Sequence, residues 1–118
     1  MNKAFGTSKI VIPCFKTIEF VLVSDIIRLE ALQNYTRFYL VGNIEIVSMR
    51  NLGSYRLKLE EYGFYLCHKS YLIQLDMIVR YHKNGYIEMQ DGVMIPIARR
   101  RRDAFINEVL DLSQISTI

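Results

Sequence analysis

The feature that most limits how this chain can fold is a series of short alternating apolar segments separated by tight-turn signals. Asn84-Gly85, Asp91-Gly92 and Gly42-Asn43 are dipeptides of the kind that joins two antiparallel strands. The segments between such turns alternate apolar and polar side chains, which is the periodicity of a strand with one buried face. We therefore expect a mainly β protein built from short antiparallel sheets.

The expected elements follow one another along the chain. Strands are expected over residues 9–12, 17–23, 26–31, 36–41, 44–47, 78–82, 86–89 and 93–97, and a further short strand opens at Phe64. Pro96 favours a sheet edge for the last strand, because proline cannot donate to a ladder. One short mid-chain helix is expected over 51–61, with Ser48 as its cap and Gly63 at its exit. A C-terminal helix is expected after Ala98, with an apolar stripe formed by Phe105, Ile106, Val109 and Leu110.

The alternation also predicts which side chains face the core. Within residues 17–23 the inward side chains are expected to be Ile18, Phe20 and Leu22. Within residues 26–31 they are expected to be Ile27, Leu29 and Ala31, with Arg28 and Glu30 facing outward.

Length and composition fit one globular domain. The chain has 118 residues, of which 51% are apolar, so disorder is not expected. No apolar run reaches the roughly 18 residues of a membrane span, and no signal core precedes the domain, so a cytoplasmic protein without membrane contact is expected. Cys14 and Cys67 stand in no pairing motif and are expected to be reduced thiols. We expect a lead-in or cloning remnant over 1–8, one domain over 9–112 and a tail over 113–118.

The positive charge is concentrated at one place. Arg99, Arg100, Arg101 and Arg102 are consecutive, and the net charge of +3 would fall to −1 without them. A local basic cluster is typical of a protein that binds a polyanion. The cluster stands at the expected start of a helix, where positive charge is unfavourable unless an anion neutralises it. A bound phosphate would do so, which favours a functional over a merely solvated cluster.

Three polar segments interrupt the apolar pattern: residues 33–36, His68–Ser70 and Ala98–Arg102. Taken alone, His68 is more often a structural histidine and Lys69 a solvated lysine. The pair His68 and Ser70 lacks an identifiable orienting partner and oxyanion site, so no catalytic role is expected. No phosphate-binding glycine loop or paired Cys/His spacing occurs, so neither a cofactor nor a metal is expected. The three segments are the candidate binding loops.

Four motifs together resemble the LytTR DNA-binding domain over about residues 9–110. They are Ile27-Arg28-Leu29-Glu30-Ala31, then Asn34-Tyr35-Thr36, then Phe64 with residues 68–73, and Ile95-Pro96-Ile97-Ala98-Arg99-Arg100. The resemblance implies short sheets stacked along one axis, with loops that enter successive major grooves of DNA. Carried over by motif, the DNA-binding residues are Asn34, Tyr35, Thr36, His68, Lys69, Ser70, Arg99, Arg100, Arg101 and Arg102. Ala98 stands where many members have serine, and Gln74 where asparagine is usual.

The expected function is that of a sequence-specific double-stranded DNA-binding domain of a bacterial transcriptional regulator. The resemblance implies either the output domain of a two-component response regulator or a free-standing protein, with a second copy as a further partner on repeated sites. Arg99 is the candidate for reading guanine, because a guanidinium fork matches the major-groove edge of that base. Lys69 is expected to contact a base or a phosphate, whereas His68, Ser70, Thr36 and the later arginines are expected to position the backbone. Two alternatives stay open, a protein-interaction module that uses tyrosine-rich faces and an RNA-binding domain.

Overall fold

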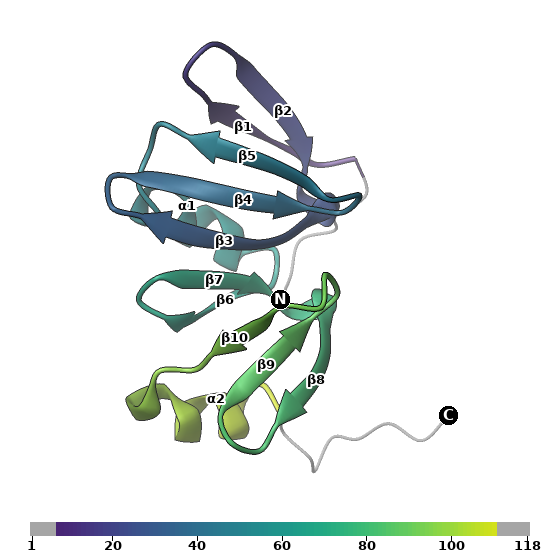
Figure 1. The fold of residues 1–118 in the computed structure, drawn as a ribbon, viewed down its shortest axis with the longest axis vertical. Coiled ribbons are helices and arrows are strands. Elements are labelled where there is room, and N and C mark those ends of the chain that lie inside the picture. Colours follow the sequence, from purple (N-terminus) through teal and green to yellow (C-terminus); the bar gives the residue numbers. More distant parts are fainter. Residues whose placement is uncertain (1–6, 111–118) are drawn as a thin grey trace.

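The computed structural model describes residues 7–110 (Figure 1). The expected tail over 113–118, and all of the expected lead-in except its last two residues, lie outside the described residues. The described part contains ten strands: β1 (Lys9–Pro13), β2 (Ile18–Leu22), β3 (Ile26–Leu32), β4 (Tyr35–Leu40), β5 (Ile44–Ser48), β6 (Phe64–His68), β7 (Tyr71–Gln74), β8 (Ile78–His82), β9 (Tyr86–Met89) and β10 (Met94–Pro96). Its helices are α1 (Gly53–Glu60) and α2 (Arg102–Glu108), with short 3-10 helices η1 (Val23–Asp25), η2 (Leu75–Met77) and η3 (Arg99–Arg101). Neither α1 nor α2 is long and apolar enough to cross a lipid bilayer.

The strands form three antiparallel sheets that follow one another along the longest dimension of the molecule, which measures 46 Å (Figure 1). The first is the β1–β2 ribbon, the second has the order β5-β4-β3-β7-β6, and the third has the order β10-β9-β8. This architecture confirms the expected fold class: mainly β, with short sheets, one short mid-chain helix and one C-terminal helix. Pro96 lies in the edge strand β10, as proline requires.

The central sheet separates two apolar cores. Leu29 and Leu72 belong to the core shared with α1 and the β1–β2 ribbon, whereas Ile27 and Ile73 belong to the core shared with α2 and the third sheet. Because β3 and β7 contribute to both cores, this part of the sheet is buried on two faces. The sheet is thereby fixed to both helices, and its turns have a rigid base.

Two turns have the backbone that their residues predicted. Gly42 and Asn43 both have positive φ, at 84° and 60°, in the three-residue connection between β4 and β5. Gly85, with φ at 97°, serves the β8–β9 turn. A Cβ atom on Gly85 would overlap the guanidinium of Arg102, so this glycine also makes room for the arginine.

The expected burial of the second strand was wrong. Ile18 and Phe20 are 63% and 65% exposed, while Val21 between Phe20 and Leu22 is buried. Among the described strands β2 pairs with β1 alone, and this ribbon packs on the molecule through one face only. Alternation identified two faces correctly, but the larger apolar side chains lie on the outer one.

Three further expectations need correction. Arg28 is buried rather than outward, because β3 lies between the two cores. Ser48 does not cap α1: its hydroxyl accepts the Arg50 N–H and contacts the Tyr55 hydroxyl. The Asn51 side chain instead accepts the N–H of Ser54 at 3.0 Å.

In the C-terminal stripe only Phe105 is fully buried, and Ile106 is exposed.

Candidate nucleic-acid interface

The three polar segments of the sequence lie along one long side of the molecule, on the left in Figure 1. They are the β3–β4 turn, the β6–β7 turn and the junction between β10 and η3. Backbone hydrogen bonds tie them together: the Ala31 N–H donates to Ser70 O at 2.8 Å, and the Ala98 N–H donates to Cys67 O at 2.9 Å. We call this side of the molecule the three-turn edge.

The β3–β4 turn is shorter than expected. Gln33 and Asn34 form the turn, with Gln33 at a φ of 57°, and β4 begins at Tyr35. Asn34 and Tyr35 are exposed at the edge. Thr36 is fully buried, and its hydroxyl donates to Arg50 O at 2.8 Å. Of the three predicted DNA-binding residues of this turn, only Asn34 and Tyr35 therefore expose their side chains.

The β6–β7 turn presents Lys69 to solvent. His68 is half-buried, and its Nδ1 accepts the N–H of Ser70 at 3.1 Å. The imidazole also lies against the ring of Tyr71, with ring centroids 5.3 Å apart. Because Nδ1 accepts a hydrogen bond, the neutral ring carries its proton on Nε2. These contacts show that His68 shapes the turn that carries Lys69.

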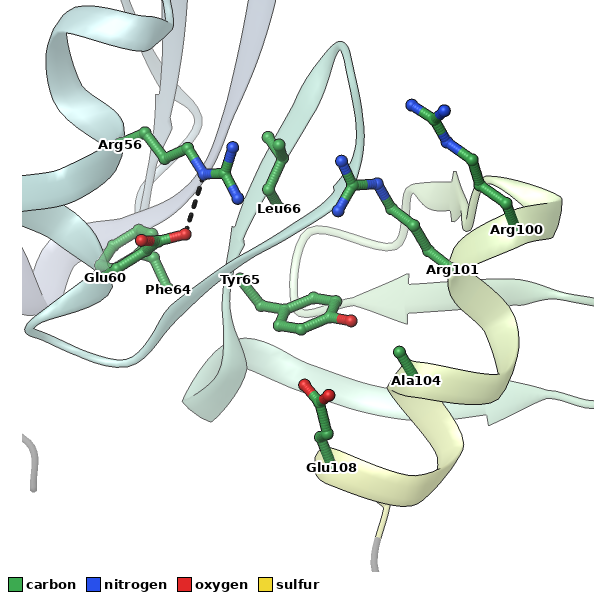
Figure 2. Close-up of a pocket in the computed structure, with 9 residues that line it drawn as sticks. All are labelled: Arg56, Glu60, Phe64, Tyr65, Leu66, Arg100, Arg101, Ala104 and Glu108. Atoms are coloured by element: carbon green, nitrogen blue, oxygen red, sulfur yellow. Dashed lines mark hydrogen bonds and ion pairs between the residues drawn. The ribbon is translucent and has the colours of Figure 1, made fainter.

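The four arginines divide into two pairs. Arg99 and Arg100 are exposed, whereas Arg101 and Arg102 are half-buried, each with a buried Nε that has no hydrogen-bond partner among residues 7–110. Arg102 lies against Gly85 of the β8–β9 turn, and Arg101 points into a groove between α1 and α2 (Figure 2). The arginines do begin the C-terminal helical segment, but the first three form η3 and α2 starts at Arg102.

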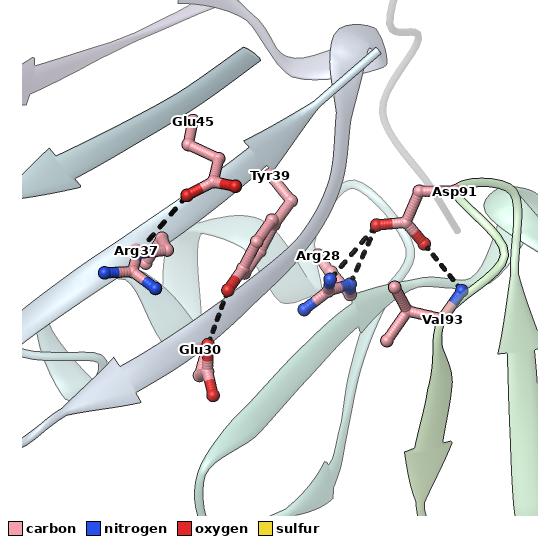
Figure 3. Close-up of polar contacts among 7 residues, drawn as sticks. All are labelled: Arg28, Glu30, Arg37, Tyr39, Glu45, Asp91 and Val93. Carbon is pink, nitrogen blue, oxygen red and sulfur yellow. Dashed lines mark hydrogen bonds and ion pairs between the residues drawn. The ribbon is translucent and has the colours of Figure 1, made fainter. Parts of the chain in front are cut away.

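The exposed cations of the three-turn edge have no carboxylate partner among residues 7–110. Within the described part of the chain, Lys69, Arg99 and Arg100 form no ion pair. Two carboxylates of the central sheet have other partners, since Glu30 accepts the Tyr39 hydroxyl at 2.7 Å and Glu45 lies 3.6 Å from Arg37 (Figure 3). The edge therefore carries positive charge that an anionic partner can neutralise.

Two arginines that matter to this geometry were not recognised in the sequence. Arg28 joins the central sheet to Asp91, just beyond β9, with both Nε and an amino nitrogen 3.1 Å from Asp91 Oδ2 (Figure 3). Arg56 of α1 lines the same groove as Arg101. An arginine four residues before Glu60 indicates only a solvated helix pair, so the sequence held no signal for Arg56.

Comparison with known proteins gives a consistent result. The sequence pattern of the LytTr DNA-binding domain matches residues 16–109. Among solved structures, the LytTr DNA-binding domain of a methyl-accepting/DNA response regulator from Bacillus cereus superposes with a TM-score of 0.73 at 17% sequence identity. The match covers 85% of this chain and 94% of that one, which shows a shared fold. Comparison with curated proteins found no match.

Proposed function

Because the chain belongs to the LytTr DNA-binding domain family, we propose that it binds double-stranded DNA sequence-specifically and regulates transcription in a bacterium. The observation that carries this proposal is the three-turn edge, where Lys69, Arg99 and Arg100 stand exposed and unpaired within the described residues.

The proposed roles follow exposure and chemistry. Arg99 reads guanine, because it is exposed and comes directly after the strand-bound segment. Lys69 contacts a base or a phosphate, while Asn34 and Tyr35 contact DNA from the β3–β4 turn. Ser70, Arg100 and Arg101 contact the backbone. His68 acts through the shape of its turn, and Arg102, whose guanidinium lies against Gly85 of the β8–β9 turn, contributes little to DNA binding.

The proposal extends to the biological setting of the domain. We propose that this domain is the output domain of a two-component response regulator, or a free-standing regulator, acting in the cytoplasm. The similar Bacillus cereus domain comes from a protein described as a response regulator. Binding of a second copy to repeated DNA sites would be compatible with a contact surface confined to one edge.

The test is selection of preferred sites from random DNA duplexes, followed by filter binding to the selected duplex, a scrambled duplex and RNA of the same sequence. The proposal requires preferential binding to the selected duplex. Equal affinity for both duplexes would remove the claim of specificity. Stronger binding to RNA would support the RNA-binding alternative.

Protein interaction is the second candidate function, and one observation favours it. The outer face of the β1–β2 ribbon exposes Val11, Ile18 and Phe20 side by side, with Val11 paired to Phe20. The expected tyrosine-rich faces are not what favours it, since Tyr55 and Tyr62 are buried. If no duplex binds at low salt, protein interaction becomes the leading function.

A further inference from the structure

A small cavity lies beside the three-turn edge, between α1, β6, the β6–β7 turn and η3. Its volume is about 230 Å³. Three of its six lining residues are cationic, namely Arg56, Lys69 and Arg101. The others are Leu52, Gly53 and Leu66, so no carboxylate from the described residues lines it.

Three cations around one cavity repel each other, and an anion between them would offset this repulsion. The lining residues include no carboxylate from residues 7–110 that could offset this charge. The three positive charges therefore favour the binding of an anion in the cavity.

Arg56 is already oriented toward this position. Its Nε donates to Glu60 Oε2 at 2.9 Å, which leaves both amino groups of the guanidinium free of that bond. Figure 2 shows Arg56 from α1 and Arg101 from η3 approaching Leu66 from opposite sides. Glu60 lines the larger neighbouring groove of about 660 Å³ but not the small cavity. Its carboxylate therefore holds Arg56 without filling the hollow.

We propose that this cavity binds one phosphate group of the DNA backbone, with Arg56, Lys69 and Arg101 as its ligands. The inference rests on the proposed function and extends it to α1, which none of the four sequence motifs includes. Guanidinium groups match the geometry of phosphate oxygens, and lysine adds a point charge. Because Lys69 belongs both to the cavity and to the three-turn edge, a strand that meets this turn passes beside the cavity.

The first experiment compares Arg56→Ala with Arg80→Ala. Arg80 is a matched control, since it too forms an ion pair with a glutamate, Glu88 at 2.8 Å, but lies in β8 away from the cavity. Each lost phosphate contact should lower the log–log salt slope by about 0.9, which makes the affinity loss between 50 and 200 mM salt about 3.5-fold smaller. We expect this change for Arg56→Ala on selected and scrambled duplexes alike, and none for Arg80→Ala.

The second experiment predicts a change in the opposite direction. Glu60→Gln keeps a side-chain oxygen that can accept the Arg56 Nε–H but removes a negative charge from the groove beside the cavity, so it should tighten binding to both duplexes several-fold. A purely structural role of the Arg56–Glu60 pair would predict that both variants weaken binding or leave it unchanged. Thermal unfolding of each variant establishes that the compared proteins are folded.

A third measurement identifies the source of the phosphate. Pyrophosphate is titrated into the protein without DNA, and the shift in melting temperature is recorded for wild type and Arg56→Ala. If Arg56→Ala loses this shift but keeps the wild-type salt slope, the cavity binds a free anion and the DNA assignment is wrong. If wild type binds duplex DNA and both Arg56→Ala and Glu60→Gln match it, this inference alone fails. If wild type binds no duplex, the proposed function fails with it.

Discussion

Removing the charge of Asp91 should destabilise the protein far more than an ordinary ion-pair mutation. The side chain of Arg28 is 5% exposed and that of Asp91 is 17% exposed, and two Arg28 nitrogens lie 3.1 Å from Asp91 Oδ2. The guanidinium also lies over the ring of Tyr39, 3.5 Å from its centroid. Asp91→Asn keeps the shape of the side chain and an oxygen for the Val93 N–H, but leaves Arg28 without its counter-charge.

The magnitude follows from the burial of the pair. Breaking a buried ion pair from one side costs roughly 3–5 kcal/mol, because the remaining charge stays desolvated. Asp91 is partly exposed, and the contact with Tyr39 remains, so we expect a loss near the lower end, about 3 kcal/mol. An exposed pair sets the comparison: Arg37 and Glu45 are 3.6 Å apart and substantially exposed, so Glu45→Gln should cost less than about 0.5 kcal/mol.

The assay is equilibrium unfolding in urea, followed by circular dichroism, for wild type, Asp91→Asn, Glu45→Gln and the double variant Arg28→Met/Asp91→Asn. An apolar side chain of similar volume removes the buried charge, so the double variant should recover more than half of the stability lost by Asp91→Asn. The reasoning is refuted if Asp91→Asn costs no more than Glu45→Gln. It is also refuted if the double variant is less stable than Asp91→Asn alone.

Four other outcomes are expected. Affinity for the selected duplex should fall by several log units per log unit of salt, and a flat dependence would remove phosphate contacts from the proposal. Arg99→Ala should cost roughly 1–3 kcal/mol of binding free energy on the selected duplex and relax specificity at one base pair, whereas Arg102→Ala should change neither quantity. If Arg99→Ala lowers the affinity for selected and scrambled duplexes equally, Arg99 is a backbone contact. His68→Gln should weaken DNA binding modestly through the shape of its turn, and a hydrolytic activity that disappears with this change would contradict a non-catalytic His68. Burial raises the pKa of the Cys67 thiol from 9.0 to about 12. The protonated thiol therefore stabilises the fold below pH 9, and this contribution is lost as pH rises toward 12. The unfolding free energy of Cys67→Ala should fall less over this interval than that of wild type.

The features that sequence predicted well are those decided by neighbouring residues. A turn at Gly42-Asn43 depends on backbone angles that these two residues adopt easily, and no distant contact changes that preference. Gly63 at the exit of α1 likewise has a positive φ, at 86°. The order of short strands and two helices followed from such local signals.

The features that sequence missed depend on distant packing. Alternation in β2 defined two faces, but only the assembled ribbon decides that Val21 packs inward and Phe20 faces out. Arg28 was expected to be solvated, and its partner Asp91 stands 63 positions further along the chain. Thr36 has the chemistry of a binding residue, but its place at the start of β4 turns its hydroxyl toward Arg50 O. In each case the sequence shows the chemistry of the side chain but does not show which residues surround it in the fold.

The candidate site shows the same division. The sequence located the arginine cluster, but it did not show that two of the four side chains are exposed and two are half-buried. Arg102 lies against the β8–β9 turn, and Arg101 lines a cavity together with Arg56 of α1. Neither α1 nor the β8–β9 turn lies near the cluster in sequence. A run of four identical residues therefore contains members with different environments, which only the assembled structure distinguishes.

The distance between the proposed contacts is set by residues that face away from the proposed DNA partner. Lys69 belongs to a turn of the central sheet, and Arg99 follows the last strand of the third sheet, so the two stand on different sheets. Cys67, which is fully buried, joins them, because its carbonyl accepts the Ala98 N–H at 2.9 Å and its thiol lies 3.8 Å from Tyr71 O and from Pro96 O. The Arg28–Asp91 pair joins the same two sheets at a second point. We infer that the preferred spacing between DNA contacts is encoded in this inter-sheet packing, because any shift of one sheet on the other moves Arg99 relative to Lys69.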